Sequence, residues 1–596
     1  MALTKVSGGL LGNLTVGTNN VALGSGALDD GSLSGANNTA IGTDSLTANT
    51  SGGANVGIGQ QALTANTTGG NNVAVGRWSL KSNVSGQFNT ALGALALEDN
   101  TANSNVAIGY NAMNLNTSGT DNVAVGTGAL DANTTGDSNT AIGDSALGAN
   151  TTASNNTAVG NSALKVNTTG VNNVALGSLA LDANTTASKN TAIGQASLSD
   201  NTTGANNTAV GQGSLQSNTT ASNNTAVGYQ ALLENTTGAD NVAMGVLALA
   251  DNTTGGSNTA LGREALEKNT TASNNTAVGY RSLQANTTGG DNVAVGATAL
   301  DANTTGAVNV AIGSNALGAN TTANYNVAVG HDALKFNTTG ANNTAVGQRA
   351  LDACTTASDN VAVGSVALSA LTTATRCVGV GQQAGGSVTT GTDNTLIGYL
   401  AGAYQNAITT GSDNTVVGSY ARTAGSTSQY EVVLGRYALG QGSQTATLGY
   451  NGNGVHISIT GSTSSWSTHS DERLKKDVED SVAGLSFIND LQPKTFKWKK
   501  RNELPTDLTN HYNENSEKEI AGESGKTYHG FIAQEVKQII ENHPEIKDGH
   551  DIWRESPDGV QNLAIGAFMP MVIKAIQELS AKCDSLQNEI ETLKGN

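Results

Sequence analysis

Cysteine, aromatic and charged residues are scarce in this chain of 596 residues. Aromatic residues make up 4% of the sequence and charged residues 13%, so any core in most of the chain must be thin and built from Ala, Val, Ile and Leu. The three cysteines, Cys354, Cys377 and Cys583, are too few and too widely spaced for a disulfide framework or a metal-ligand cluster. We therefore expect no metal and no cofactor.

Proline is absent from the chain before Pro493, and the same region is poor in positive charge. All five prolines lie after Ser470, as do 16 of the 29 Lys and Arg residues. The chain thus joins two different kinds of sequence near Ser470. A proline-free region fits strands in the interior of a sheet, because each such strand needs its backbone N–H groups for the hydrogen-bond ladder.

The charge balance and the lack of long apolar runs narrow the range of partners. The formal net charge is −18, and the region before Ser470 has no cluster of Lys and Arg, so we expect no nucleic-acid partner. The N-terminal sequence has no apolar stretch long enough for a signal peptide, and no segment approaches a membrane span. We expect a soluble product of the cytoplasm, without membrane insertion.

A repeat of constant length occupies most of the chain. The glycine that ends each Val-Ala-Val-Gly or Thr-Ala-Ile-Gly run recurs at every seventeenth residue from Gly109 to Gly398. Earlier glycines drift by at most one residue, and the later ones at Gly418, Gly435 and Gly449 loosen to intervals of 20, 17 and 14. A fixed period of this length predicts a solenoid in which identical residues stack in successive rungs.

One unit, residues 224–240, indicates what each rung contains. It predicts a short strand ending at the corner Gly228, a second extended or coiled segment around Ala231 and Leu232, and a polar turn. In parallel rungs the repeated Asn positions would form ladders, and Gly and Asn would supply left-handed backbone angles at the corners. Neither face of the strand carries a charge, so we expect one face to fill the coil and the other to pack on a neighbouring chain.

The Asn-X-Ala-(Val/Ile/Leu)-Gly pattern of the repeat resembles the head repeats of trimeric autotransporter adhesins and also repeats in phage tail fibres. The resemblance implies a mainly β fold, with a trimeric rod of parallel β-solenoid or β-roll type followed by a smaller α+β domain that ends in a coiled-coil helix. We divide the chain into an N-terminal segment (1–19), a regular rod (20–384), irregular distal repeats with a cleavage junction (385–469), and a C-terminal domain (470–596).

Three other uses of a β-solenoid are disfavoured by the residues of the repeat. Paired threonines such as Thr236 and Thr237 are adjacent and lie in a turn, whereas an ice-binding array needs alternating threonines. The Asp positions are too irregular for a calcium-binding roll. Acidic residues such as Asp121 and Glu234 lie at variable turn positions, so no carboxylate pair for glycan cleavage can be named.

The segment after Ser470 carries several motifs in a set order. They are Ser470-Asp471-Glu472-Arg473-Leu474-Lys475, Leu491–Trp498, Tyr528–Val536 and a terminal amphipathic helix. This combination closely resembles the self-cleaving intramolecular chaperone at the C-terminus of phage endosialidases, tailspikes and tail fibres, which is serine peptidase family seventy-four. Without that resemblance, the first motif alone would indicate only a capped helix start.

The resemblance implies a Ser-Lys dyad that cuts the chain once. In that family's Ser-Asp-x-Arg-x-Lys motif, Ser470 would attack the His469–Ser470 bond with Lys475 as the general base, supported by Asp471 and Arg473. A neutral lysine needs a lowered pKa, and we expect burial on assembly, or a nearby cation, to supply it. The five-residue spacing allows contact within one subunit only if the serine lies in a turn before the helix, and contact across subunits is the alternative.

The last segment has an apolar stripe whose spacings alternate between four and three residues. Its members are Val572, Ile576, Leu579, Cys583, Leu586, Ile590 and Leu593. This heptad pattern predicts self-association through a coiled coil, although the mixed Leu and Ile positions do not decide between dimer and trimer. The resemblance implies a homotrimer.

We interpret the sequence as a structural phage tail fibre, located in the virion after synthesis in the host cytoplasm. Its expected partners are copies of itself, other phage tail proteins, and a host cell-surface receptor or glycan. The irregular rungs with Tyr404, Tyr420, Tyr430 and Tyr437 are the first place to seek a binding tip. Two alternatives stay open: a bacterial surface adhesin stalk, and a fibre that depolymerises a surface polysaccharide.

Overall fold

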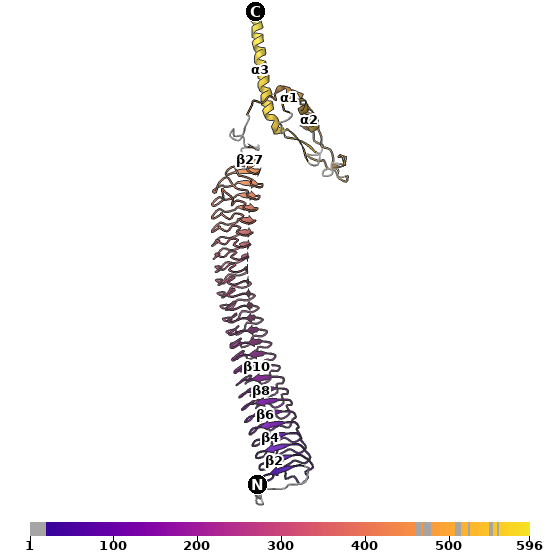
Figure 1. Cartoon of the computed structure of the whole chain (residues 1–596), viewed down its shortest axis with the longest axis vertical. Coiled ribbons are helices and arrows are strands. Elements are labelled where there is room, and N and C mark those ends of the chain that lie inside the picture. The colour runs from indigo at the N-terminus through magenta and orange to yellow at the C-terminus, as the bar shows by residue number, and fades with distance from the viewer. Residues whose placement is uncertain are drawn as a thin grey trace, which may run out of the picture. The chain divides into compact units, whose positions relative to one another are not determined.

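The computed structural model describes residues 19–459, 467–468, 478–506, 514–521, 525–546, 552–556 and 560–595. The chain forms two compact units, Met1–His469 and Ser470–Asn596, coloured indigo to orange and orange to yellow in Figure 1. The first is a stack of short strands, and the second combines helices with two small sheets.

The strands of the first unit recur once per rung. They are β1 (Val21–Leu23), β2 (Thr39–Ile41), β3 (Val56–Ile58), β4 (Val73–Val75), β5 (Thr90–Leu92), β6 (Val106–Ile108), β7 (Val123–Val125), β8 (Thr140–Ile142), β9 (Thr157–Val159), β10 (Val174–Leu176), β11 (Thr191–Ile193), β12 (Thr208–Val210), β13 (Thr225–Val227), β14 (Val242–Met244), β15 (Thr259–Leu261), β16 (Thr276–Val278), β17 (Val293–Val295), β18 (Val310–Ile312), β19 (Val327–Val329), β20 (Thr344–Val346), β21 (Val361–Val363), β22 (Val378–Val380), β23 (Thr395–Ile397), β24 (Thr415–Val417), β25 (Val432–Leu434), β26 (Thr445–Tyr450), β27 (Asn453–Ser458) and β28 (Ser467–Thr468).

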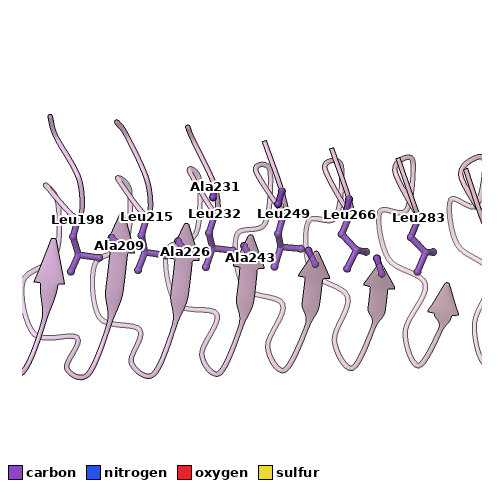
Figure 2. Packing of buried hydrophobic residues seen from close by; sticks show 14 of the residues in the cluster. Leu198, Ala209, Leu215, Ala226, Ala231, Leu232, Ala243, Leu249, Leu266 and Leu283 are labelled. Atoms are coloured by element: carbon purple, nitrogen blue, oxygen red, sulfur yellow. The ribbon is translucent and has the colours of Figure 1, made fainter. Parts of the chain in front are cut away.

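Successive strands from β1 to β26 pair in parallel, each with the next along the chain. In β13 and β14, for example, Ala226 lies opposite Ala243, the equivalent residue of the next repeat. The middle residue of each strand points into the coil, and Figure 2 shows these alanines facing a row of leucines that includes Leu232 and Leu249. The predicted parallel β-solenoid is confirmed, and so is its thin core.

The composition of that core differs from the prediction in one respect. Alanines such as Ala226 and leucines such as Leu232 are fully buried, whereas the larger apolar residue that ends each strand of the regular rungs lies on the opposite face and stays partly exposed. Because neighbouring residues of a strand point to opposite faces, the small central alanine is the one that faces inward. A single chain therefore buries one face of the sheet, and packing of the other face on a neighbouring chain stays a prediction.

Two buried asparagine ladders hold the rungs in register. In the first, the backbone N–H of Asn241 donates to Oδ1 of Asn224 at 2.9 Å. In the second, Nδ2 of Asn252 donates to Oδ1 of Asn235 at 2.8 Å and to the carbonyl oxygen of Gly255 at 2.9 Å. These amides are fully buried but have partners, as buried polar groups must. The predicted ladders are confirmed.

The wall opposite the strands consists of turns, not of a second sheet. Its backbone still bonds from rung to rung, because the N–H of Leu232 donates to the oxygen of Ala248 and that of Glu234 to the oxygen of Ala250, both at 2.9 Å. Gln230 and Leu232 adopt φ of 52° and 56°. The expected left-handed angles at Asn positions are present, as at Asn223 with φ of 62°. The buried leucine adopts one as well, because the closure of the coil dictates its backbone.

The last rungs depart from the regular pattern. Extra residues enter between Gly402 and Ile408, and the step from β23 to β24 along the chain is consequently longer than in the regular rungs, with Thr395 opposite Thr415. After β26 the chain reverses, so that β27 and then β28 pair in antiparallel fashion. This hairpin ends the parallel ladder.

The second unit contains three α-helices, two 3₁₀ turns and four strands among its described residues. They are α1 (Leu485–Asp490), β29 (Lys494–Phe496), η2 (Arg501–Glu503), β30 (Tyr528–Gly530), α2 (Ala533–Asn542), β31 (Trp553–Glu555), β32 (Gln561–Leu563), η3 (Ile565–Phe568) and α3 (Met569–Lys594). Their common core includes Phe487, Val536, Ile540, Ile552 and Phe568. This is the expected smaller α+β domain with a terminal helix. In the part of the chain that the structure describes, no helix has the length and apolarity needed to cross a membrane.

Candidate assembly and autocleavage site

The residues predicted for autocleavage, His469, Ser470, Asp471, Arg473 and Lys475, lie outside the described residues. The Ser-Lys dyad therefore stays a prediction. The structure does describe the strand that precedes this segment and the chain that follows it.

Upstream, β28 brings the chain to the predicted cut as part of the sheet. Thr468 lies opposite Val455 of β27, and Ser467 lies opposite His456. The rod's sheet thus extends to one residue before the His469–Ser470 bond. Downstream, the described chain resumes at Val478, which is 68% exposed, and then enters α1.

The two central motifs of the C-terminal sequence meet in space. Leu491–Trp498 contains β29, and Tyr528–Val536 contains β30 and the start of α2. The two strands pair in antiparallel fashion, with Lys494 opposite Gly530 and Phe496 opposite Tyr528, and Nζ of Lys494 lies 3.4 Å from a carboxylate oxygen of Glu535. The two motifs thus form one structural element, the antiparallel strand pair.

A cavity of about 570 Å³ opens beside this strand pair. Its walls are mainly apolar and aromatic, from Phe496, Trp498, Phe531 and Ile565, with His529 among the polar groups. Among the described residues, its lining includes no Asp or Glu, so these residues offer no carboxylate pair for cutting a glycan. Among the residues described, no three His, Cys, Asp or Glu side chains lie close enough to hold a metal ion.

A buried histidine connects α1 to the end of α2. Nε2 of His543 lies 2.9 Å from a carboxylate oxygen of Asp490, and its Nδ1 lies 2.6 Å from one of Glu545. The side chain is 8% exposed and its ring contacts Phe487 edge-on. Burial opposes protonation, but the two carboxylates outweigh it and raise the pKa of His543 above its usual value.

We expect this contact to make the second unit more stable at mildly acidic pH. Because the folded pKa exceeds the unfolded one, the stabilisation is complete below about pH 6.5 and is lost as the pH rises through the folded pKa. We expect about 1 kcal/mol, since Asp490 is largely exposed and water weakens its part. Urea titrations followed by circular dichroism at 222 nm, at pH 5.5 and 8.5, measure the effect.

The matched variant is His543→Gln, which keeps a polar side chain but cannot become charged. Its urea midpoint should change less between the two pH values than that of the wild-type chain. An equal change in both proteins would show that the pH dependence comes from other groups.

The apolar stripe of α3 is largely open to solvent. Cys583 is exposed, and Ile576, Leu579, Leu586, Ile590 and Leu593 are each at least 50% exposed. Val572 differs, because it also packs against the unit's own core. The stripe is thus available for contact over all but its first turn.

Sequence reasoning missed two residues that hold this unit together. A carboxylate oxygen of Glu578 on α3 accepts the backbone N–H of Leu485 at 2.8 Å, at the start of α1, and His543 bridges α1 and α2 as described above. A single sequence carries no signal that pairs residues 93 positions apart.

The boundaries of this unit can be compared with known families. Residues 470–543 match the family described as chaperone of endosialidase. The match begins at Ser470, the residue after the predicted cut, and it covers α1, β29, β30 and α2. No curated protein shows a significant match to the chain. The C-terminal unit thus contains a chaperone domain of the endosialidase type, and α3 follows the matched region.

Proposed function

We propose that this protein is a phage tail fibre whose solenoid rod is assembled as a homotrimer by the C-terminal chaperone domain, which then cuts itself off between His469 and Ser470. The observation that supports this most directly is the junction: the rod's last strand ends at Thr468, and the chaperone match begins at Ser470. In the proposed reaction Ser470 is the nucleophile and Lys475, from the same or a neighbouring subunit, is the general base.

The open face of the rod supports association of several chains. The residue that ends each strand is apolar, and Leu92, Leu176, Met244 and Ile312 are 41–47% exposed in the single chain. Since identical positions stack in register, these side chains form a continuous strip along the sheet. Monomeric soluble proteins seldom expose apolar strips of this extent, so a second copy of the same strip is the partner we propose.

We propose that the C-terminal units associate before the rods fold. A long parallel β structure loses much chain entropy before its stabilising contacts form. A chaperone domain and a helical stripe that bring chains together first would place all rods in one register and lower this cost. Once the rods have folded, the chaperone domain is no longer needed. We propose this as the reason for its cleavage.

Cys583 offers a direct test of parallel, in-register pairing at α3. It is the exposed cysteine, whereas Cys354 and Cys377 are buried. In a parallel coiled coil, copies of one stripe residue face one another, so mild oxidation should link two chains through Cys583. Electrophoresis without reductant should show the C-terminal fragment at twice its mass, and dithiothreitol should reverse the shift.

The control is Cys583→Ser, which should give no linked species under the same oxidation. Absence of linkage in the wild-type protein, together with a monomeric mass by light scattering, would contradict the proposed association. Light scattering of the uncut Ser470→Ala protein should give the mass of three chains.

Host attachment and the virion location belong to the same proposal. Detection of the chain in purified virions would support the tail fibre over a cell-surface adhesin stalk. Incubation of the fibre with host capsule should release no oligosaccharide, whereas released oligosaccharide would favour a depolymerase.

A further inference from the structure

Four tyrosines form one cluster on the edge of the irregular rungs. The rings of Tyr420 and Tyr437 stack at 4.4 Å with their planes 3° apart. Tyr399 and Tyr404 each approach Tyr420 edge-on, with ring centroids 5.0 Å away. The sequence had pointed to Tyr430 as well, but no ring contact joins that residue to the cluster among the described residues, and Tyr399 takes its place.

The solenoid register explains why these rings meet. Tyr420 and Tyr437 each lie two residues after a corner glycine, so the rung-to-rung stacking places one directly above the other. Tyr404 comes from the insertion after Gly402. In repeat proteins, insertions of this kind commonly lie on the face that binds.

Two arginines accompany the rings without a counter-ion. The guanidinium of Arg422 lies 5.6 Å from the centre of the Tyr404 ring, and that of Arg436 lies 5.2 Å from the centre of Tyr437. Among the described residues, no carboxylate forms an ion pair with either of them. In a chain with a net charge of −18, these are two cations of one aromatic cluster, and Arg436 is exposed to an anion in solvent.

Most arginines of the regular rungs behave differently. Arg281 pairs with Glu264 at 2.6 Å, Arg349 with Asp352 at 2.8 Å, and Arg376 with Asp393 at 2.7 Å. Arg77 is an exception, because its guanidinium lies 4.0 Å from the centre of the Trp78 ring and forms no ion pair among the described residues. Most arginines of the regular rungs are thus neutralised by a carboxylate, whereas the two at the tyrosine cluster have no such partner among the described residues. This contrast favours a charged ligand over a purely structural role.

Part of the cluster is accessible to solvent. Tyr399 is 39% exposed, and Arg436 is exposed. Burial, followed by the nearby Tyr399 and Tyr437 hydroxyls, raises the pKa of the Tyr420 phenol. The four tyrosines therefore offer ring faces and hydroxyl groups beside two guanidinium groups.

We propose that this cluster binds an acidic saccharide, which deepens the proposed attachment function and rests on it. The faces of tyrosine rings carry partial negative charge and attract the C–H groups of a pyranose ring. A guanidinium group binds a carboxylate through two parallel hydrogen bonds. A chain of hexuronic acid units presents both features at a regular spacing.

Saturation-transfer NMR with the purified fibre tests the inference. The probes are a hexamer of galacturonic acid and its carboxyl-reduced counterpart. We expect saturation of ring protons of the acidic hexamer and little of the reduced one. Tyr437→Ala and Arg436→Glu should each weaken binding about tenfold or more, because each removes a stacking or charged contact.

The matched control is Tyr229→Ala. Tyr229 is an exposed tyrosine at a corner of the regular rod, and no ring contact joins it to another aromatic residue among those described. Its loss should leave binding unchanged. All variants are first checked for the wild-type mass by light scattering.

Each other outcome has a distinct meaning. A correctly assembled fibre that transfers no saturation to the acidic hexamer overturns the saccharide site and leaves the assembly function intact. Loss of the oligomer in Tyr437→Ala would identify a contact between chains and also overturn the inference. Variants that lose the hexamer but still adsorb to host cells as well as wild type would show that attachment uses another surface.

Discussion

The Ser470→Ala chain is expected to stay intact, whereas the wild-type chain yields two fragments, one ending at His469 and the other beginning at Ser470. The variant removes the hydroxyl that would attack the preceding carbonyl, and no other nucleophile replaces it. Intact-mass measurement of the purified protein checks the result. We expect cleavage to fall from near completion to below detection.

The same measurement separates the general base from its neighbour. Lys475→Ala should be as inactive as Ser470→Ala, and Lys476→Ala, the adjacent lysine, should still be cut. Cleavage that persists in Ser470→Ala, or that is lost equally in Lys476→Ala, would refute the proposed dyad.

Co-expression of the two inactive chains decides whether the lysine acts across subunits. In mixed oligomers, a Lys475→Ala chain keeps its serine and can use the lysine of a Ser470→Ala neighbour. Restored cleavage of the Lys475→Ala chain alone would show action between subunits. If both chains stay uncut, the dyad forms within one subunit.

Gly211→Ala is expected to disrupt the hydrogen bonds between neighbouring rungs of the rod. Gly213→Ala, in the same rung, should be tolerated. Gly211 has φ of 135°, and a Cβ there would collide with the carbonyl oxygen of Gly228 in the next rung. Gly213 has φ of 63°, and its Cβ would lie 3.3 Å from the nearest atom, at the end of the flexible Gln216 side chain. Other rungs place alanine or glutamine at this position, such as Ala196 and Gln230.

We expect Gly211→Ala to cost about 3 to 5 kcal/mol, from backbone strain and overpacking together. Gly213→Ala should cost about 1 kcal/mol or less. Since a solenoid rung interacts only with its neighbours, the damage should be confined to adjacent rungs. Hydrogen exchange measured by mass spectrometry on peptides from residues 205–230 should show lost protection in the first variant alone. Equal protection in both variants would disprove the steric argument.

The solenoid could be predicted almost completely from the sequence, because each repeat carries the residues that define its rung. A fixed interval between glycines specifies the rung, and an asparagine recurring at the same place specifies a ladder that only stacking can satisfy. Ala226 between two larger residues could equally have faced either way. Its inward orientation depends on the width of the coil, which a single unit does not reveal, and this is why the outward position of Val227 was missed.

Other features required the three-dimensional structure. Leu232 in a left-handed conformation contradicts local preference, because closure of the coil overrides it. The tyrosine cluster was predicted in part, since Tyr404, Tyr420 and Tyr437 are conspicuous in a chain poor in aromatic residues. The part that Tyr399 plays depends on contacts between rungs, and so does the lack of an ion pair to Arg422 among the described residues. In the chaperone domain, the motifs were visible, but their pairing as β29 and β30 was not.

The antiparallel hairpin at the end of the rod has a consequence for the finished fibre. A stack of parallel rungs ends in a row of unpaired N–H and C=O groups, which can recruit another stack and grow into an open-ended polymer. β27 covers this edge with a strand of opposite direction, whose hydrogen-bond spacing does not suit a further parallel rung, and the two-residue strand β28 pairs with part of β27. Both strands precede the proposed cut. The released rod would therefore keep the strands that cover the edge of its parallel sheet. Removal of the chaperone would not expose an edge for amyloid-like growth.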